Sequence, residues 1–403
     1  MPEPESTAQS VRHAGRVALA CALRASRADT LATFALYTQA LPALLVPQRT
    51  ELNPPLWELG HVGWFQEYWL ARNAQRTRGP VADPDIARPC GVRANADALY
   101  DSSRVSHEAR WSLPLPDAQA THADLATQLE QTLALLADTS DNDDALYFFR
   151  LALLHEDMHH EAALYMAQSL GLAIPDARWQ AQALPDPQAA LELPAGPWRL
   201  GQDALQGFAF DNELGRREEQ LSAQAMDCAV VRWAEYLPFV DAGGYRNPAW
   251  WSKEGQRWLA ATQAQTPRYL RRTGHNWEQW RHGQWCALDL ALPACHLSFF
   301  EAQAWCTWRQ RRLPTEAQWE RAALTQPEHF RWGDVWEWTA SAFTPFQGFT
   351  PHPYRDYSQP WFDGRPVLRG ASFATQPRLR HVRYRNFFPA DRNDIFAGFR
   401  SCA

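Results

Sequence analysis

Apolar residues recur with helical spacing through about the first 170 residues of the chain. The pattern predicts four main helices, and a section rich in proline and arginine separates the second helix from the third. Pro54 and Pro55 mark the start of the second helix, and Asp141 to Asp144 cap the fourth. The predicted helices cover residues 11–40, 55–75, 121–137 and 143–170. This order predicts a four-helix bundle with one long crossover, residues 76–116, and loops of that length are usually functional.

The pattern changes after Gly171. Prolines stand at positions 175, 185, 187, 194 and 197, and helical periodicity is weak beyond them. The remainder is rich in Gly, Trp, Pro and Arg, with short strand-like runs and one clear helix over residues 298–311. We therefore expect a multidomain α+β protein: a helical bundle in residues 1–175, a Pro-rich linker in 176–197 and a mixed α+β domain in 198–403.

Composition excludes several functional classes. The length of 403 residues and the hydrophobic content of 46% suit two domains with separate cores. The net charge is −6 and the basic residues are spread along the chain, so we expect no nucleic-acid partner. The first residues lack the apolar core of a signal peptide and no apolar run reaches membrane-spanning length, so we expect a cytoplasmic protein with no membrane partner. The sequence does not indicate an oligomeric state.

Cysteines and aromatic residues bear on the kind of site to expect. The seven cysteines are scattered and form no CxxC pair, so a metal in this protein must be held by other ligands. The 20 tryptophans and 19 phenylalanines are an unusual surplus. Aromatic surplus usually means core, but aromatic faces also form cages for quaternary ammonium ligands.

The strongest candidate chemistry lies in the fourth predicted helix. His155 and His159 stand one turn apart on the same helical face, a spacing that lets two imidazoles hold one metal ion. A third ligand must come from another helix, and His61 in the second helix lies beside two glycines that permit close approach. Three neutral imidazoles leave coordination positions open and suit Fe, Zn, Cu or Ni. The alternative is that these histidines only pack or hydrogen-bond within the bundle.

Several motifs together resemble one enzyme family. His155-x-x-x-His159-x-Glu161, with the upstream His61, resembles the HxxxHxE signature of the DinB-type bundles in the sulfoxide synthases of ergothioneine biosynthesis. The second half resembles the formylglycine-generating-enzyme fold attached to those bundles, over residues 210–213, 241–245, 312–320, 333–339, 368–372 and 384–389. The resemblance covers nearly the whole chain. It implies a DinB-like four-helix bundle followed by a formylglycine-generating-enzyme-like, C-type-lectin-like α+β domain.

The resemblance also implies a site. It implies an Fe(II) centre on His61, His155 and His159, O2 as co-substrate, and hercynine (trimethyl-histidine) bound between the domains with its imidazole on the metal. Asn386 and Phe387 match the family segment that lines the hercynine pocket.

The chain departs from the family pattern at positions that bear on the chalcogen donor. The crossover lacks the Arg-His-Pro-Arg type of segment found in family members that use γ-glutamylcysteine, and Phe388 stands where those members have an Asp. The clamp for the γ-glutamyl group is therefore absent. Arg104 is a candidate contact of the chalcogen donor only because of its position in the crossover. After Trp338 the family continues with a proton-donating Tyr, whereas this chain has Phe343 and Phe346 as pocket candidates. Tyr100 in the crossover is then the candidate proton donor, unless it only packs. Met158 replaces a Gln, which makes the pocket more apolar.

These departures resemble the selenoneine synthase branch, which joins hercynine to a selenosugar. The sequence hypothesis is therefore an iron-dependent oxidoreductase that forms a carbon–selenium bond. One alternative within the same chemistry is a sulfoxide synthase that uses cysteine or γ-glutamylcysteine. Alternatives from other classes are a metal-dependent thiol transferase that needs no oxygen and a non-catalytic module that binds a betaine.

Overall fold

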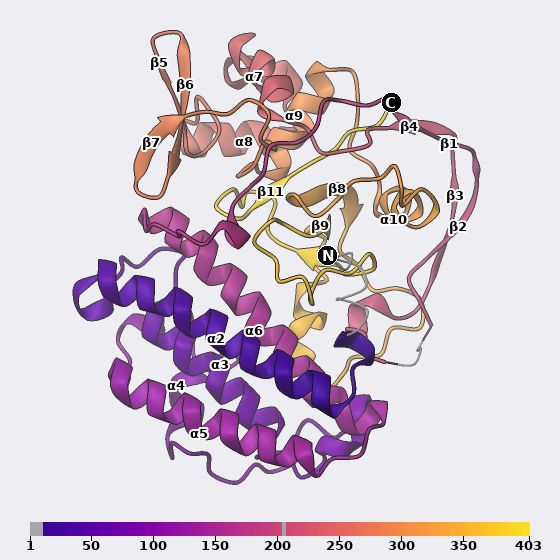
Figure 1. Cartoon of the computed structure of the whole chain (residues 1–403). Helices are drawn as coiled ribbons and strands as arrows, with labels where there is room; N and C mark the ends of the chain where they lie inside the picture. The colour runs from indigo at the N-terminus through magenta and orange to yellow at the C-terminus, as the bar shows by residue number, and fades with distance from the viewer. Residues whose placement is uncertain (1–10, 204–206) are drawn as a thin grey trace.

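The computed structural model describes residues 11–203 and 207–403 (Figure 1). Its N-terminal half is helical, and the four longest helices of the described residues pack against one another as a bundle. They are α2 (Arg16–Ala40), α3 (Pro55–Trp69), α5 (Ala118–Ala137) and α6 (Asp143–Leu170). Each helix predicted from the sequence has a counterpart in this set.

The ends of the bundle helices follow local capping chemistry. The Asn142 side chain accepts a hydrogen bond from the Ala145 amide at the start of α6, and Gly171 ends the helix in the left-handed conformation at φ 74°. The start and end of α6 therefore agree with the sequence prediction. Helix α3 ends at Trp69 rather than near residue 75, because the backbone of Leu70 leaves the helical conformation at φ −110° and ψ −81°; beyond that point Arg72 binds Asp97 in the crossover.

Two glycines let α3 pack closely against its neighbours. A Cβ added at Gly60 would lie 2.2 Å from Cζ of Tyr100, and one added at Gly63 would lie 2.2 Å from Oε1 of Gln128 on α5. The crossover thus lies directly on α3. It contains the short helix α4 (Ala96–Tyr100) and 3-10 turns at Arg76–Val81 and Glu108–Trp111.

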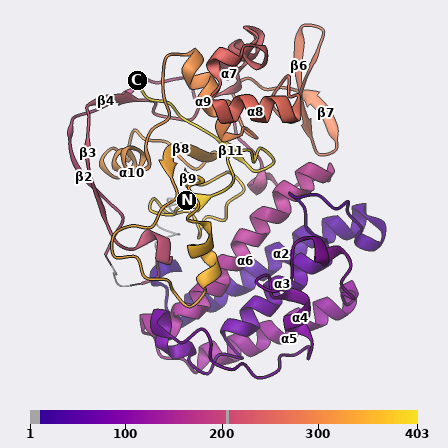
Figure 2. The same cartoon turned by 180° about the vertical axis from the view of Figure 1, so that it is seen from behind.

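The C-terminal half combines short strands with short helices. Its largest sheet has the strand order β10-β9-β8-β11, with β11 parallel to β8 and the other pairs antiparallel. These strands are β8 (Trp336–Ala342), β9 (Pro366–Gly370), β10 (Asn386–Phe387) and β11 (Ala397–Gly398). A three-stranded antiparallel sheet lies beyond the C-terminal end of α6 (Figure 2) and consists of β5 (Leu270–Thr273), β6 (Asn276–Arg281) and β7 (Gln284–Ala287).

The segment expected to be a linker, residues 176–197, is partly β-structure. It holds β1 (Leu191–Leu193) and the start of β2 (Gly196–Leu200). These strands pair with β4 (Gln224–Met226) and β3 (Arg217–Leu221). The partners are distant in sequence, so the local proline pattern does not reveal the pairing.

The second half contains more helix than the sequence pattern predicts. The expected helix over residues 298–311 is present as α9 (Phe299–Trp308), with Ser298 as its N-cap. Three further helices are α7 (Trp233–Asp241), α8 (Lys253–Thr262) and α10 (Glu316–Thr325). All three are ten residues or shorter, close to the length below which a helical period is hard to recognise, and α7 contains Pro238, a residue that argues against helix in a sequence pattern.

Buried ion pairs hold the second half together. Arg385 and Arg369 both bind Glu316, at 2.6 and 3.0 Å, and all three side chains are fully buried. Arg400 pairs in the same way with Glu337. These arginines are therefore structural partners of internal acids rather than groups that could bind an external carboxylate.

Helix α6 joins the two halves (Figure 1). Asp157, buried on α6, accepts two hydrogen bonds of 2.7 Å from Arg378 and one of 2.6 Å from Ser26 on α2. The helix that carries two of the candidate ligands is therefore fixed to both halves of the molecule. No helix among the described residues is long and apolar enough to cross a membrane.

This contact leads to a prediction for stability. Arg378→Ala leaves the buried Asp157 with one remaining donor, so we expect the free energy of unfolding to fall by about 3–5 kcal/mol. The matched control is Arg355→Ala, which breaks an exposed Arg355–Asp85 pair between the same two halves. Its expected cost is below about 1 kcal/mol. Urea unfolding followed by tryptophan fluorescence measures both, and equal losses would contradict the prediction.

Candidate metal centre and substrate pocket

Three histidines converge at the junction between α3 and α6. His155 and His159 lie one turn apart on α6 with ring centroids 4.5 Å apart, and His61 on α3 lies 5.2 and 4.8 Å from them. Each offers one ligand atom, and these atoms all lie within 4.8 Å of one another. The structure therefore brings together the three histidines that the sequence proposes as a metal site.

Two of these rings are oriented by contacts at Nδ1. His61 Nδ1 lies 2.8 Å from the backbone oxygen of Tyr100, and His159 Nδ1 lies 2.6 Å from Oε2 of Glu58. An acceptor at Nδ1 places the ring proton there and leaves the lone pair on Nε2 for a metal. Both contacts are typical of metal-binding histidines, which donate their second N–H to a carboxylate or carbonyl.

The third ring, His155, is held by packing. It stacks on Phe65 with a centroid separation of 3.5 Å, and its buried Nδ1 has no hydrogen-bond partner among the described residues. A buried nitrogen without a partner is costly unless a further group binds the ring. The residues therefore fit a metal with three imidazole ligands, a donor set that does not choose among Fe, Zn, Cu and Ni.

Burial keeps two of these imidazoles, those of His61 and His155, neutral. Burial, with repulsion from His159, lowers the pKa of His61 to about 3, and burial lowers the pKa of His155 well below its usual range. Burial by itself raises the pKa of Glu58, but attraction to His159 and their hydrogen bond outweigh it and lower that pKa to about 2. Neutral imidazoles are the form that binds metals.

A pocket of about 210 Å³ opens beside His159, between α6 and the C-terminal half. Met158, Asn386 and Phe388, three of the predicted substrate contacts, line it. Most of the lining is apolar or aromatic, which suits a flat or cationic ligand. The lining residues are Met158, His159, Glu161, Ala162, Tyr165, Trp336, Leu379, Tyr384, Asn386, Phe388 and Ile395.

Glu161 is the acidic residue in this lining. Ser372, Thr375 and Trp336 donate hydrogen bonds of 2.5, 2.7 and 2.8 Å to its carboxylate. Burial raises the pKa of Glu161, and these three donors oppose the rise by stabilising the ionised form. The last residue of the HxxxHxE pattern therefore holds α6 to the C-terminal half and places a carboxylate in the pocket wall.

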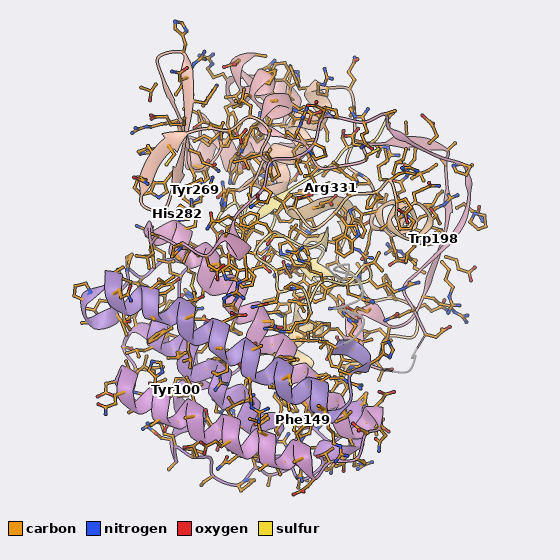
Figure 3. The ribbon with its side chains drawn as sticks, viewed as in Figure 1. Tyr100, Phe149, Trp198, Tyr269, His282 and Arg331 are labelled. Carbon is orange, nitrogen blue, oxygen red and sulfur yellow. The ribbon has the colours of Figure 1, made fainter. Side chains whose placement is uncertain are left out.

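Tyr100 contacts the candidate metal centre through its backbone oxygen rather than through its phenol. It ends α4 in the helical half (Figure 3), and its backbone oxygen is the one that contacts His61. Its phenol packs against Gly60, and the hydroxyl is buried without a hydrogen-bond partner among the described residues. Burial raises its pKa to about 12. The hydroxyl of the predicted proton donor is thus not part of the pocket lining.

The remaining predicted contacts lie outside the pocket lining. Phe343 and Phe346 are buried in the C-terminal half, where their rings cover Arg385 at 4.9 and 4.0 Å. Phe387 stacks on Phe343 at 4.2 Å. Arg104 is 78% exposed and pairs with Asp101. The structure does not bring these four predicted contacts to the metal centre.

Besides the stacked rings of Phe65 and Trp57, sequence reasoning missed two further residues that contact the candidate ligands. Tyr354 packs edge-on against His155, with centroids 6.0 Å apart, and against Phe65 at 4.9 Å. Glu58 binds His159. Glu58 stands three residues before His61, a helical spacing that could have indicated it, whereas no local pattern links Tyr354 to α6.

Comparison with known proteins gives relatives that align over most of the chain. The hercynine oxygenase of Mycolicibacterium smegmatis is 29% identical over 87% of this chain and 90% of its own length. That of Mycobacterium tuberculosis is 29% identical over 95% of this chain and 97% of its own length. Among solved structures, PvdO from Pseudomonas aeruginosa matches with a TM-score of 0.34 and 15% identity, over 53% of this chain and 92% of its own.

The C-terminal half has a family match of its own. The formylglycine-generating enzyme of Bos taurus is 32% identical over 37% of this chain and 43% of its own length. The model of the sulfatase-modifying factor enzyme 1-like domain matches residues 177–334 and 329–403, which confirms the predicted type of the second half. Because these segments make up more than half of the chain, the protein belongs to this family, and it is an enzyme homologous to the hercynine oxygenases.

Proposed function

We propose that this chain is a mononuclear non-haem Fe(II) enzyme that uses O2 to join selenium from a selenosugar to the imidazole carbon of hercynine. The observation that carries the proposal is the position of three imidazoles next to an aromatic pocket between the two halves. The names of the two mycobacterial relatives support hercynine as the acceptor. We also propose that the bundle is of DinB type and that residues 176–197 connect it to the substrate-binding domain, to which they contribute β1 and the start of β2.

The pocket suits a betaine. The rings of Trp336, Tyr384 and Tyr165 line it, and aromatic faces attract a quaternary ammonium group. The buried carboxylate of Glu161 adds a complementary charge, and the Asn386 amide can donate to the carboxylate of the ligand. With its ammonium group held there, the imidazole of hercynine can reach the metal beside His159.

His61, His155 and His159 would hold the metal, which supplies Lewis-acid and one-electron chemistry toward O2 when bound. The carbon–selenium bond replaces the C–H bond between the two imidazole nitrogens and the Se–H bond of the donor, and the two protons and two electrons released pass to O2. The stacked rings of Phe65 and Trp57 exclude water around His155 and His61. Tyr354, in contact with His155, is our proposed proton donor in place of Tyr100.

The crossover supports a donor without carboxylates. The four arginines at positions 88, 93, 104 and 110 each bond a protein oxygen, and none of them lines the pocket beside His159, where a γ-glutamyl clamp would be needed. The pairs are Arg88 with Asn73, Arg93 with Asp124, Arg104 with Asp101 and Arg110 with Asn53. Phe388, where relatives of the γ-glutamylcysteine type carry an Asp, adds an apolar ring to the pocket. A hydroxyl-rich, uncharged selenosugar suits these surroundings.

The second candidate is a hercynine sulfoxide synthase that uses cysteine or γ-glutamylcysteine. The names of the full-length relatives favour it, because they specify hercynine but no selenium donor.

One experiment separates these candidates. The protein is reconstituted anaerobically with Fe(II) and hercynine, then exposed to air with a selenosugar, cysteine or γ-glutamylcysteine, and products are read by mass spectrometry. We expect a selenium isotope pattern on the hercynine skeleton with the selenosugar alone. A sulfoxide from a thiol donor would instead select the second candidate. Product in the anaerobic control would indicate a transferase, and no product from any donor would indicate a binding module.

A further inference from the structure

One turn of α3 carries one candidate ligand and a carboxylate that contacts a second candidate ligand. His61 is itself a candidate ligand, and Glu58, three residues earlier on the same helix, lies 2.6 Å from Nδ1 of His159 on α6. Glu58 is 8% exposed, and the groups that bind its two oxygens are a histidine and an amide rather than an Arg or Lys. A buried carboxylate without a full cationic partner is costly, so its place beside a ligand needs an explanation.

The second oxygen of Glu58 is also held. Asn53 donates from Nδ2 to Oε1 of Glu58 at 2.6 Å, and Arg110 donates to Oδ1 of Asn53 at 2.9 Å. The guanidinium of Arg110 lies 3.8 Å from the ring centre of Trp57, and Trp57 stacks on His61. A chain of contacts thus runs from the crossover through Asn53 and Glu58 to His159.

We propose that Glu58 is the positioning residue of the metal centre, which fixes the tautomer and direction of His159, and that Asn53 and Arg110 hold Glu58 in place for this role. The inference rests on the proposed metal site. With both oxygens bound, the carboxylate cannot rotate away from Nδ1, so Nε2 of His159 keeps its lone pair directed at the metal. An accepting carboxylate also makes the imidazole a stronger ligand.

The test measures metal affinity rather than turnover. Glu58→Gln keeps the size of the side chain but removes its charge, and we expect Fe(II) to bind about 10–100-fold more weakly in anaerobic calorimetry. The visible spectrum of the Co(II)-loaded variant should change as well, because it reports the ligand field.

The matched control is Glu67→Gln. Glu67 lies on the same helix, is also buried and accepts hydrogen bonds from the Val92 amide and Gln128, but does not contact a candidate ligand. We expect wild-type affinity and spectrum in this variant, with an unfolding midpoint of the metal-free protein similar to that of Glu58→Gln. Equal losses of affinity in both variants would assign Glu58 a merely structural role and overturn the proposal.

A second variant covers the case in which Glu58→Gln does not fold. Asn53→Ala frees one oxygen of Glu58 without touching a candidate ligand, and we expect a smaller loss of Fe(II) affinity, of a few-fold. Wild-type affinity in every variant that folds would overturn the proposal. If the wild-type protein itself bound no metal, the proposed metal site would be wrong, an outcome distinct from a failure of Glu58 alone.

Discussion

His159→Ala is expected to abolish stoichiometric binding of Fe(II) and to reduce product formation below detection. The imidazole of His159 lies 4.5 and 4.8 Å, ring centre to ring centre, from the other two candidate ligands, and two imidazoles alone are a weak site for a divalent metal. His155→Ala should behave in the same way. Metal analysis of the purified, reconstituted variants and a product assay with hercynine measure both effects.

The control for this prediction is the neighbouring histidine on α6. His160 is buried as well, but its Nε2 lies 3.0 Å from the Thr33 hydroxyl and its ring packs on Trp179. His160→Gln can keep the contact with Thr33, so we expect full iron content and near wild-type turnover. Full iron and turnover in His159→Ala would contradict the assignment of the metal centre.

Tyr354→Phe is expected to lower turnover by about 10²–10⁴-fold while Fe(II) and hercynine still bind. A phenol that donates a proton in the reaction typically contributes an effect of this size, and the substitution removes one hydroxyl without changing the packing against His155 and Phe65. Single-turnover kinetics, with separate binding measurements for the metal and for hercynine, distinguish this loss from a loss of binding.

Tyr100→Phe is the matched comparison, because it removes the same group from the other candidate. The Tyr100 hydroxyl is buried without a partner among the described residues, and the backbone oxygen that contacts His61 remains in the variant. We therefore expect turnover within about two-fold of wild type, well below the effect of a positioned acid. The reverse result, with a large loss in Tyr100→Phe and none in Tyr354→Phe, would restore the proton donor suggested by the sequence.

The helical half could be predicted because its signals are local. Apolar residues at helical spacing and the caps at the ends of α6 lie within the segment they determine. The C-terminal half could not be predicted in the same detail. Its strands are short, and the residues of β1 and β2 pair with residues 17 to 35 positions further along the chain. Strand pairing of this kind depends on contacts between residues that lie too far apart in the sequence to appear in one short stretch of it.

In the candidate site, too, local features could be predicted from the sequence and long-range contacts could not. The sequence alone determined that His155 and His159 share a helical face, because the helix repeat fixes the direction of both side chains. The tertiary structure decided which groups surround them. Tyr354 precedes a 3-10 turn and Tyr100 ends the five-residue helix α4, and Phe388 and Phe346 are both phenylalanines in or near segments that resemble the family.

In each pair the packing of distant elements selects one residue for the site and buries the other elsewhere. Tyr354 contacts His155, whereas the phenol of Tyr100 packs on Gly60. Phe388 lines the pocket, whereas Phe346 covers Arg385. The backbone conformation repeats along a helix, so the spacing of two residues alone predicts whether their side chains point to the same face. A loop has no such repeat, and the direction of its side chains follows only from the elements packed against it.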